Sequence, residues 1–139
     1  MNTSSLTAGL MVAGRVGASM AAEIGTMQVA LARFLEYKEH YLELPAFYQA
    51  KRDHLRSAMA KSRFQPLACH GTYFQLFDYS EITGDSDGDL VKRLTVEHGV
   101  AAIPVSVFYG DGSDNKVIRL CFAKDEQTLS RAAEILCKI

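Results

Sequence analysis

The feature that most restricts how this chain folds is an apolar run, residues 117–123 (VIRLCFA), that contains a single cation, Arg119. β-Branched and aromatic residues predict a strand here, so Arg119 is expected to lie among apolar neighbours. Burying a guanidinium is costly unless an anion meets it. Its partner is therefore a carboxylate of the protein or of a bound molecule, unless the side chain extends its charged end into solvent. The fork of Arg grips a carboxylate by two parallel hydrogen bonds, which makes a small carboxylic acid such as an amino acid a sensible ligand.

Composition limits the classes of protein that fit the chain. Its 139 residues predict one domain, and 48% apolar with 22% charged residues is typical of a soluble globular protein. A net charge of −1 without a basic cluster argues against nucleic-acid binding. The three cysteines lie far apart and show no metal-ligand spacing, so no metal site is predicted. They are expected to be reduced, as in a cytoplasmic protein, and to fill small buried positions.

The first 27 residues differ in composition from the rest. Residues 6–27 are rich in small and apolar residues, but Arg15 and Glu23 interrupt them. The uncharged stretch is shorter than the roughly 20 residues that span a bilayer, and no basic region precedes it as in a signal peptide. No membrane association is therefore predicted. Several glycines lower the helix propensity, so a weak helix is expected.

The rest of the chain has the pattern of an α+β domain, a small sheet with helices packed on it. Caps and apolar periodicity predict four helices: 28–42, 46–62, one from Ser86 or Asp87 to His98, and a final one capped by Asp125. In helix 46–62 the apolar stripe is Phe47, Tyr48, Leu55 and Met59. Apolar and β-branched runs predict strands 71–79, 100–103, continuing extended through 105–109, and 117–122. The residues show no nucleophile–base pair and no glycine-rich phosphate loop.

Four segments of residues 28–139 resemble the class I and II aminotransferases, the pyridoxal-phosphate enzymes of fold type I. The segments are 40–53 (HYLELPAFYQAKRD), 71–80 (GTYFQLFDYS), 99–110 (GVAAIPVSVFYG) and 118–129 (IRLCFAKDEQTL). They occur in the family's order and spacing, with kynurenine–oxoglutarate and methionine aminotransferases the most similar subgroup. The resemblance implies that residues 28–139 form the C-terminal small domain of such an enzyme. One departure is His70, where family members usually carry Glu.

The resemblance also assigns candidate substrate-binding residues. In the family the Arg of the last segment binds the substrate's α-carboxylate, and in this sequence that residue is Arg119. Tyr73, Phe74 and Phe108 are expected beside the substrate, and packing in the core or in an interface is the alternative role for each. Pro104 and Tyr109 are expected at the border of the same cleft. The implied ligand is an amino acid or a 2-oxo acid.

The parts of a transaminase that hold pyridoxal phosphate are not expected in this chain. The Schiff-base lysine, the acid against the pyridine nitrogen and the phosphate donors come from the large domain of the family. None of the seven lysines stands in the family's Ser-x-x-Lys setting. We therefore expect no catalytic or cofactor-binding residue here, no covalent hold on the cofactor and no transamination by the chain alone. Activity would need a large-domain partner, and a homodimer is a further expected assembly. The alternative is a non-catalytic soluble domain that binds a small carboxylate or a protein partner.

The N-terminal segment carries a different resemblance. Within residues 6–27, the stretch 12–27 (VAGRVGASMAAEIGTM) resembles part of the permease subunit of bacterial MCE-type lipid ABC transporters. The match is too short to imply transport. The change at Met27–Gln28 is interpreted as a join between a permease-like segment, 1–27, and the aminotransferase-like domain, 28–139. A fusion, a rearranged or truncated gene, or an error in assembling the sequence would each produce it.

Overall fold

The structure is a computed structural model in which residues 25–139 are described, and the chain divides into two compact units, Met1–Glu43 and Leu44–Ile139. In the first unit residues 25–36 are helical, and the short helix α2 (Glu39–Leu42) follows after a break. The sequence predicted one helix over 28–42. The break arises because the amides of Tyr37 and His40 bond to carbonyls three residues earlier, as in a 3-10 turn. The weak helix expected in residues 1–27 lies outside the described residues up to residue 24.

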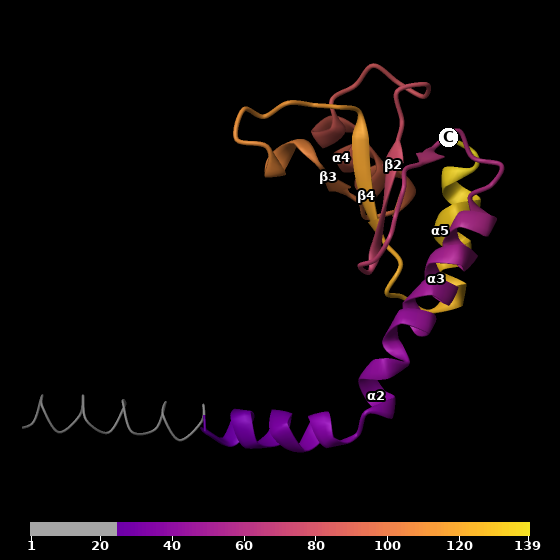
Figure 1. Ribbon diagram of the computed structural model, residues 1–139. Coiled ribbons are helices and arrows are strands. Elements are labelled where there is room, and N and C mark those ends of the chain that lie inside the picture. Colours follow the sequence, from indigo (N-terminus) through magenta and orange to yellow (C-terminus); the bar gives the residue numbers. More distant parts are fainter. Residues whose placement is uncertain (1–24) are drawn as a thin grey trace, which may run out of the picture. The chain divides into compact units, whose positions relative to one another are not determined.

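The second unit is built on a four-stranded antiparallel sheet with strand order β1-β2-β4-β3 (Figure 1). The strands are β1 (Gln65–Pro66), β2 (Phe74–Asp78), β3 (Ile103–Pro104) and β4 (Val117–Cys121). β2 and β4, the two longest, are neighbours in the centre. This sheet with its helices confirms the predicted α+β class, and β2 and β4 lie within the predicted strands.

Three helices and a 3-10 turn complete this unit: α3 (Leu44–Ala58), α4 (Asp87–His98), η1 (Ser106–Phe108) and α5 (Glu126–Leu136). Ser86 caps α4 by accepting a hydrogen bond from the amide of Asp89, and Asp125 caps α5 through the amide of Thr128. Gly99 ends α4 in the left-handed conformation, with φ of 69°. These caps and this stop were predicted from the sequence. Among residues 25–139, no helix combines the length and the apolar character that a membrane crossing requires.

The hydrophobic core lies on one face of the sheet. Alternate residues of a strand face opposite sides. Besides the polar Gln75, the buried members of the central strands are the apolar Phe77, Ile118 and Leu120. They pack with a set of buried helix residues, namely Leu55, Met59, Leu90, Leu94, Leu129, Ala133 and Leu136. In Figure 1, α3 and α5 run side by side and α4 lies behind the sheet. The opposite face, which carries Arg119, is therefore left without a helix of this unit.

Two expectations about burial and one about secondary structure are wrong. Phe47 is 52% exposed, because it is rotated by about 80° around α3 from Leu55, whereas Tyr48 lies almost in line with Leu55. Cys121 is exposed because strand alternation places it on the open face, and the other two cysteines are half-buried. Residues 106–108 form a 3-10 turn instead of extended chain. There, Asp87 binds both the amide and the hydroxyl of Ser106 and so draws the backbone away from a strand.

Candidate carboxylate-binding site

Strand β4 places Arg119 at the centre of the open face of the sheet. Arg119 pairs with Leu76 of β2 on one side and with Ile103 of β3 on the other. Its guanidinium carbon Cζ lies 4.5 Å from the ring centroid of Phe74 and 5.4 Å from that of Phe108. Both distances fall within the ~6 Å at which a cation is attracted to the face of an aromatic ring. Two aromatic rings from separate segments therefore hold the guanidinium.

Arg119 has no acidic partner within residues 25–139. The ion pairs of this part of the chain join Arg52 to Asp53, Arg93 to Asp85 and Lys116 to Asp114. The side chain of Arg119 is half-buried, and no hydrogen bond connects it to a protein oxygen in the described region. The sequence left three surroundings for the Arg119 guanidinium: a carboxylate of the protein, a carboxylate of a bound molecule, or solvent. The first of these is not found within residues 25–139. The guanidinium keeps N–H donors that are free to meet an external anion.

The predicted site residues are connected to one another through their rings. Tyr73, which is 49% exposed, packs edge-on against Phe74 with ring centroids 5.5 Å apart. Phe74 in turn contacts Arg119, and Phe108 contacts Arg119 from the segment between β3 and β4. We call this group, Tyr73, Phe74, Phe108 and Arg119, the Arg119 site. The structure brings these four residues together, and their role toward a substrate stays a prediction.

The remaining border residues lie close in sequence but make no recorded ring contact with Arg119. Pro104 is half-buried in β3, where it pairs with Ile118. Tyr109 follows η1 and is 44% exposed. His70, the departure from the family pattern, is exposed before β2. Their placement at the border of a substrate site stays a prediction.

A cleft of about 540 Å³ adjoins the site. Its lining is mainly apolar and comes chiefly from residues 99–103, β4 and α5. Three cations also line it, namely Arg119, Lys124 and Arg131. Arg119 and Leu120 both line it although they face opposite sides of the sheet. Phe74 and Phe108 are not part of the lining, so the cleft adjoins the Arg119 site and does not enclose it. The lining contains no Asp or Glu.

The described residues do not fit pyridoxal phosphate. A covalent site needs a lysine, an acid for the ring nitrogen and phosphate donors that converge on one cavity. Lys51 donates to the carbonyl oxygen of Lys124 at 2.6 Å, and Lys116 is bound to Asp114 and to two loop carbonyls. Lys124 lines the cleft, but no carboxylate lies there with it. Within residues 25–139 no group of acidic, His and Cys side chains is arranged to hold a metal ion.

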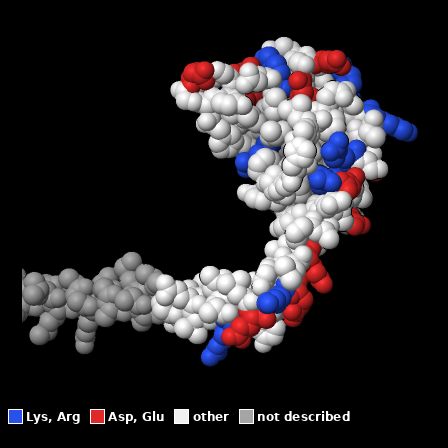
Figure 2. Space-filling view, in the orientation of Figure 1, with Lys and Arg blue, Asp and Glu red and all other residues white. Residues whose placement is uncertain are grey.

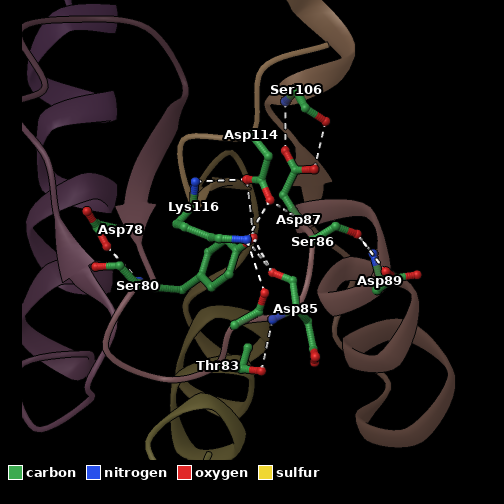
Figure 3. Close-up of polar contacts among 12 residues, drawn as sticks. Asp78, Ser80, Thr83, Asp85, Ser86, Asp87, Asp89, Ser106, Asp114 and Lys116 are labelled. Carbon is green, nitrogen blue, oxygen red and sulfur yellow. Dashed lines mark hydrogen bonds and ion pairs between the residues drawn. The ribbon is translucent and has the colours of Figure 1, made fainter.

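A second polar cluster, which the sequence did not reveal, includes Ser106, the first residue of η1 (Figure 3). Asp87 accepts hydrogen bonds from the amide and the hydroxyl of Ser106, both at 2.7 Å. Asp114 accepts from the amide of Asp87 at 3.2 Å and from the ammonium of Lys116 at 2.8 Å. Desolvation acts to raise the pKa of Asp114, but the hydrogen bonds from Lys116 outweigh it and hold that pKa below its usual value. Burial, reinforced by the charge of Asp114, raises the pKa of Tyr79 far above its usual value.

Charge on the visible surface gives no sign of an extended binding face. Figure 2 shows basic and acidic side chains mixed over the visible face of residues 44–139, with uncharged surface between them. Nucleic-acid-binding proteins instead gather Lys and Arg on one face. Arg119 stands out in this unit because its guanidinium lies against two aromatic rings, whereas Lys51 lies over the single ring of Phe47.

Comparison with known proteins identifies relatives. A family model described as aminotransferase class I and II matches residues 13–136. The chain is 54% identical over 110 residues to methionine aminotransferase of Escherichia coli K12, which covers 78% of this chain and 28% of that protein. It is 34% identical over 134 residues to kynurenine–oxoglutarate transaminase of Dictyostelium discoideum, covering 81% of this chain and 31% of that protein. The chain thus spans about three tenths of the length of these curated relatives.

Solved structures agree in fold. A crystal structure of the Escherichia coli methionine aminotransferase superposes with a TM-score of 0.70 at 54% identity, over 73% of this chain and 27% of that chain. N-succinyldiaminopimelate aminotransferase of Mycobacterium tuberculosis superposes with a TM-score of 0.61 at 32% identity, over 67% of this chain and 24% of that chain. Each comparison covers two thirds or more of this chain and about a quarter of the relative.

Proposed function

Because the chain belongs to the class I and II aminotransferases, a pyridoxal-phosphate-dependent family, we propose that residues 28–139 act as the small domain of such an enzyme. In this proposal Arg119 binds the α-carboxylate of an amino acid, such as methionine or kynurenine, or of the 2-oxo acid acceptor. Catalysis needs a large domain that supplies the cofactor site, so the chain alone does not transaminate. A cytoplasmic location is part of the proposal, in keeping with three free cysteines among the described residues.

The observation that carries the proposal is the state of the Arg119 guanidinium. It is half-buried between two aromatic rings and has no carboxylate partner in residues 25–139. Contacts with ring faces hold the cation but do not occupy its N–H donors, which lie in the plane of the guanidinium. A carboxylate that approaches in that plane can take two parallel hydrogen bonds. The site is thus preorganised for a planar anion, which limits the entropy lost on binding.

The aromatic residues also favour the side chains of the proposed substrates. Phe74 and Phe108 lower the local polarity, which strengthens an ion pair with Arg119. Tyr73 extends the same apolar surface through its contact with Phe74. Aromatic rings accept both the sulfur of a thioether and the face of another ring. Methionine and kynurenine, the substrates in the relatives' names, carry these two groups.

The test is calorimetric titration of the purified chain with L-methionine. Arg119→Lys keeps the charge but loses the fork, and we expect its dissociation constant to rise about tenfold or more, since bidentate contacts are not replaced by Lys. Arg131→Lys is the matched control, because Arg131 also lines the cleft but is exposed on α5, and it should bind like the unchanged chain. The amine that lacks the carboxylate of methionine should not bind. Equal affinities of the two variants would contradict the assignment of Arg119.

A non-catalytic role as a partner-binding domain is the second candidate. It is favoured by the exposure of Val107, Phe108 and Tyr109, three consecutive residues that leave 65%, 61% and 44% of their surfaces uncovered. Mixing the chain with the separately produced large domain of the Escherichia coli methionine aminotransferase discriminates between the two. Amino transfer from methionine to a 2-oxo acid in the mixture supports the enzyme-derived role. Binding without transfer supports the second candidate.

The division of the chain at residue 27 belongs to the same proposal. The family match begins at residue 13, inside the segment that resembles a permease, so the two resemblances overlap there. Residues 1–24 are outside the described structure, so the position of the boundary has to be tested on the DNA sequence of the gene. Sequencing genomic DNA across codon 27 tests the division, and an uninterrupted aminotransferase reading frame through that codon would contradict it.

A further inference from the structure

We infer that Asp87 is a positioning residue for the Arg119 site. Its buried carboxylate fixes the 3-10 turn η1, and η1 in turn places the ring of Phe108 against the Arg119 guanidinium. The inference rests on the proposed function, because carboxylate binding by Arg119 is what this placement serves. It assigns a role to a residue that lies outside the Arg119 site and on a different element.

The first step is the use that Asp87 makes of its two oxygens. Asp87 is 2% exposed, and a buried carboxylate is costly unless hydrogen bonds compensate for the lost water. Oδ2 accepts from the amide of Ser106 and Oδ1 accepts from its hydroxyl, each at 2.7 Å (Figure 3). Both bonds are charge-assisted and both go to one residue. They fix the position of Ser106 and the direction of its backbone.

Helix capping does not explain Asp87. From sequence alone Ser86 and Asp87 were equivalent candidates for the cap of α4. The structure gives that role to Ser86, whose hydroxyl accepts from the amide of Asp89 at 3.1 Å. Asp87 is therefore free of the cap and directs its carboxylate across to η1. Its own amide donates to Asp114, so Asp87 is itself held in place.

The second step runs from Ser106 to Phe108. Ser106 is the first residue of η1, and the turn is closed by hydrogen bonds from the amide of Phe108 to Val105 and from that of Tyr109 to Ser106. A three-residue turn has little stability of its own and depends on anchors at its ends. The Phe108 side chain is 61% exposed, so packing covers less than half of it. Its place 5.4 Å from Arg119 is therefore set mainly by the backbone that Asp87 anchors.

The other ring of the site does not need this support. Phe74 is the first residue of β2 and pairs with Cys121 of β4, next to the hydrogen bond from the amide of Phe122 to the carbonyl of Tyr73. Its backbone is fixed by the sheet, and its ring is half-buried. Loss of the Asp87 contact should therefore release one ring of the site and leave the other in place. This asymmetry separates a positioning role from a general loss of structure.

The experiment places 4-fluorophenylalanine at position 108 of the full 139-residue chain and records its fluorine resonance. Asp87→Asn substitutes an amide that opposes one donor of Ser106, and we expect the resonance to shift or broaden. Ser106→Ala removes only the hydroxyl bond and should give a smaller change of the same sign. Asp89→Asn is the matched control, because it removes the same charge from the same helical turn but contacts Ser86 instead of η1. Identical resonances in the Asp87→Asn, Asp89→Asn and unchanged chains would overturn the inference.

Binding of L-methionine supplies the second readout. We expect Asp87→Asn to raise the dissociation constant about threefold, the effect of losing one partly exposed cation–π contact. In a Phe108→Ala background the same substitution should have no further effect, because Asp87 acts through that ring. An equal loss in both backgrounds would show that Asp87 supports the fold as a whole and would overturn the inference. If the unchanged chain does not bind methionine, the proposed function fails, while the fluorine resonance still decides the role of Asp87.

Discussion

The ring of Phe74 lies 4.5 Å from the guanidinium carbon of Arg119, across the two central antiparallel strands of the sheet. The two residues are diagonal neighbours, since Arg119 pairs directly with Leu76 and Phe74 pairs with Cys121. Diagonal pairs on one face of a sheet are within reach of long and aromatic side chains. The geometry of the central strand pair therefore builds half of the Arg119 site without any contribution from a loop.

Replacing Phe74 tests that half of the site. Phe74→Leu keeps an apolar side chain but removes the ring, and we expect methionine to bind about two- to fivefold more weakly, the range of an exposed to partly buried cation–π contact. Thermal unfolding should change little, because the substitution keeps most of the buried volume. Calorimetry of the variant measures the binding. Tyr48→Leu is a matched aromatic-to-Leu control, since Tyr48 packs against the core and is not in the Arg119 site. A similar loss of binding in both variants would argue against a specific role of Phe74.

The acid stability of the domain should depend on Asp114. Hydrogen bonds from Lys116 depress the pKa of this carboxyl in the folded state below the value expected in the unfolded chain. A depressed carboxyl pKa adds stability above the unfolded pKa, and this stability is lost as the pH falls through the folded pKa. Urea unfolding between pH 7 and pH 2 should show the loss below about pH 4, the region where unperturbed carboxyls titrate. Asp114→Asn should be less stable at pH 7 and should show a smaller part of the acid-dependent loss. The same acid dependence in both chains would exclude Asp114 as its source.

The chain should form no specific adduct with pyridoxal phosphate. Lys51 and Lys116 are engaged with protein oxygens, and the cleft beside Lys124 contains no acid that would engage the pyridine nitrogen. Borohydride reduction of the mixture followed by peptide mass spectrometry should find only low, scattered modification of several lysines. Stoichiometric labelling of one lysine would contradict the proposal that the cofactor site lies in a large-domain partner.

The exposed residues Val107 and Tyr109 should promote self-association. Together with Phe108 they form an apolar stretch on η1 and the residue after it, and such exposed stretches commonly mark interaction surfaces. Sedimentation velocity should show a concentration-dependent increase in mass. Val107→Ser should reduce it, whereas Val96→Ser on α4 should not, although Val96 is 76% exposed. A monomer at every concentration would contradict this expectation and would argue against a homodimer.

The parts of the fold that were predictable are those that local sequence determines. The caps at Ser86 and Asp125, the stop at Gly99 and the central strand around Arg119 each depend on residues within a few positions. β1 has two residues and ends in Pro66, so it shows no periodicity to recognise. Of the strand predicted over 100–103, only Ile103 lies in β3, which ends at Pro104. Pairing with a longer neighbour makes them strands.

The candidate site was predictable only in its residues and not in the contacts that build it. The apolar run singled out Arg119, and the family resemblance added Tyr73, Phe74 and Phe108. The contact of Phe108 with Arg119 depends on the bonds between Asp87 and Ser106, which lie 19 residues apart in the chain. No spacing rule links two such residues, and an aspartate in a first helical turn is ordinarily explained by its interaction with the helix dipole.

The unequal burial of the two rings beside Arg119 has a consequence for how such a site can diversify. Phe74 is half-buried in the central sheet, so a polar or much smaller residue there disturbs the fold along with ligand binding. Phe108 stands largely in solvent on a short turn, and its replacement disturbs little beyond the space it occupies. Substitutions at residue 108 can therefore change the size and polarity of the ligand side chain that the site accepts. Arg119 and the central sheet that carries it stay unchanged.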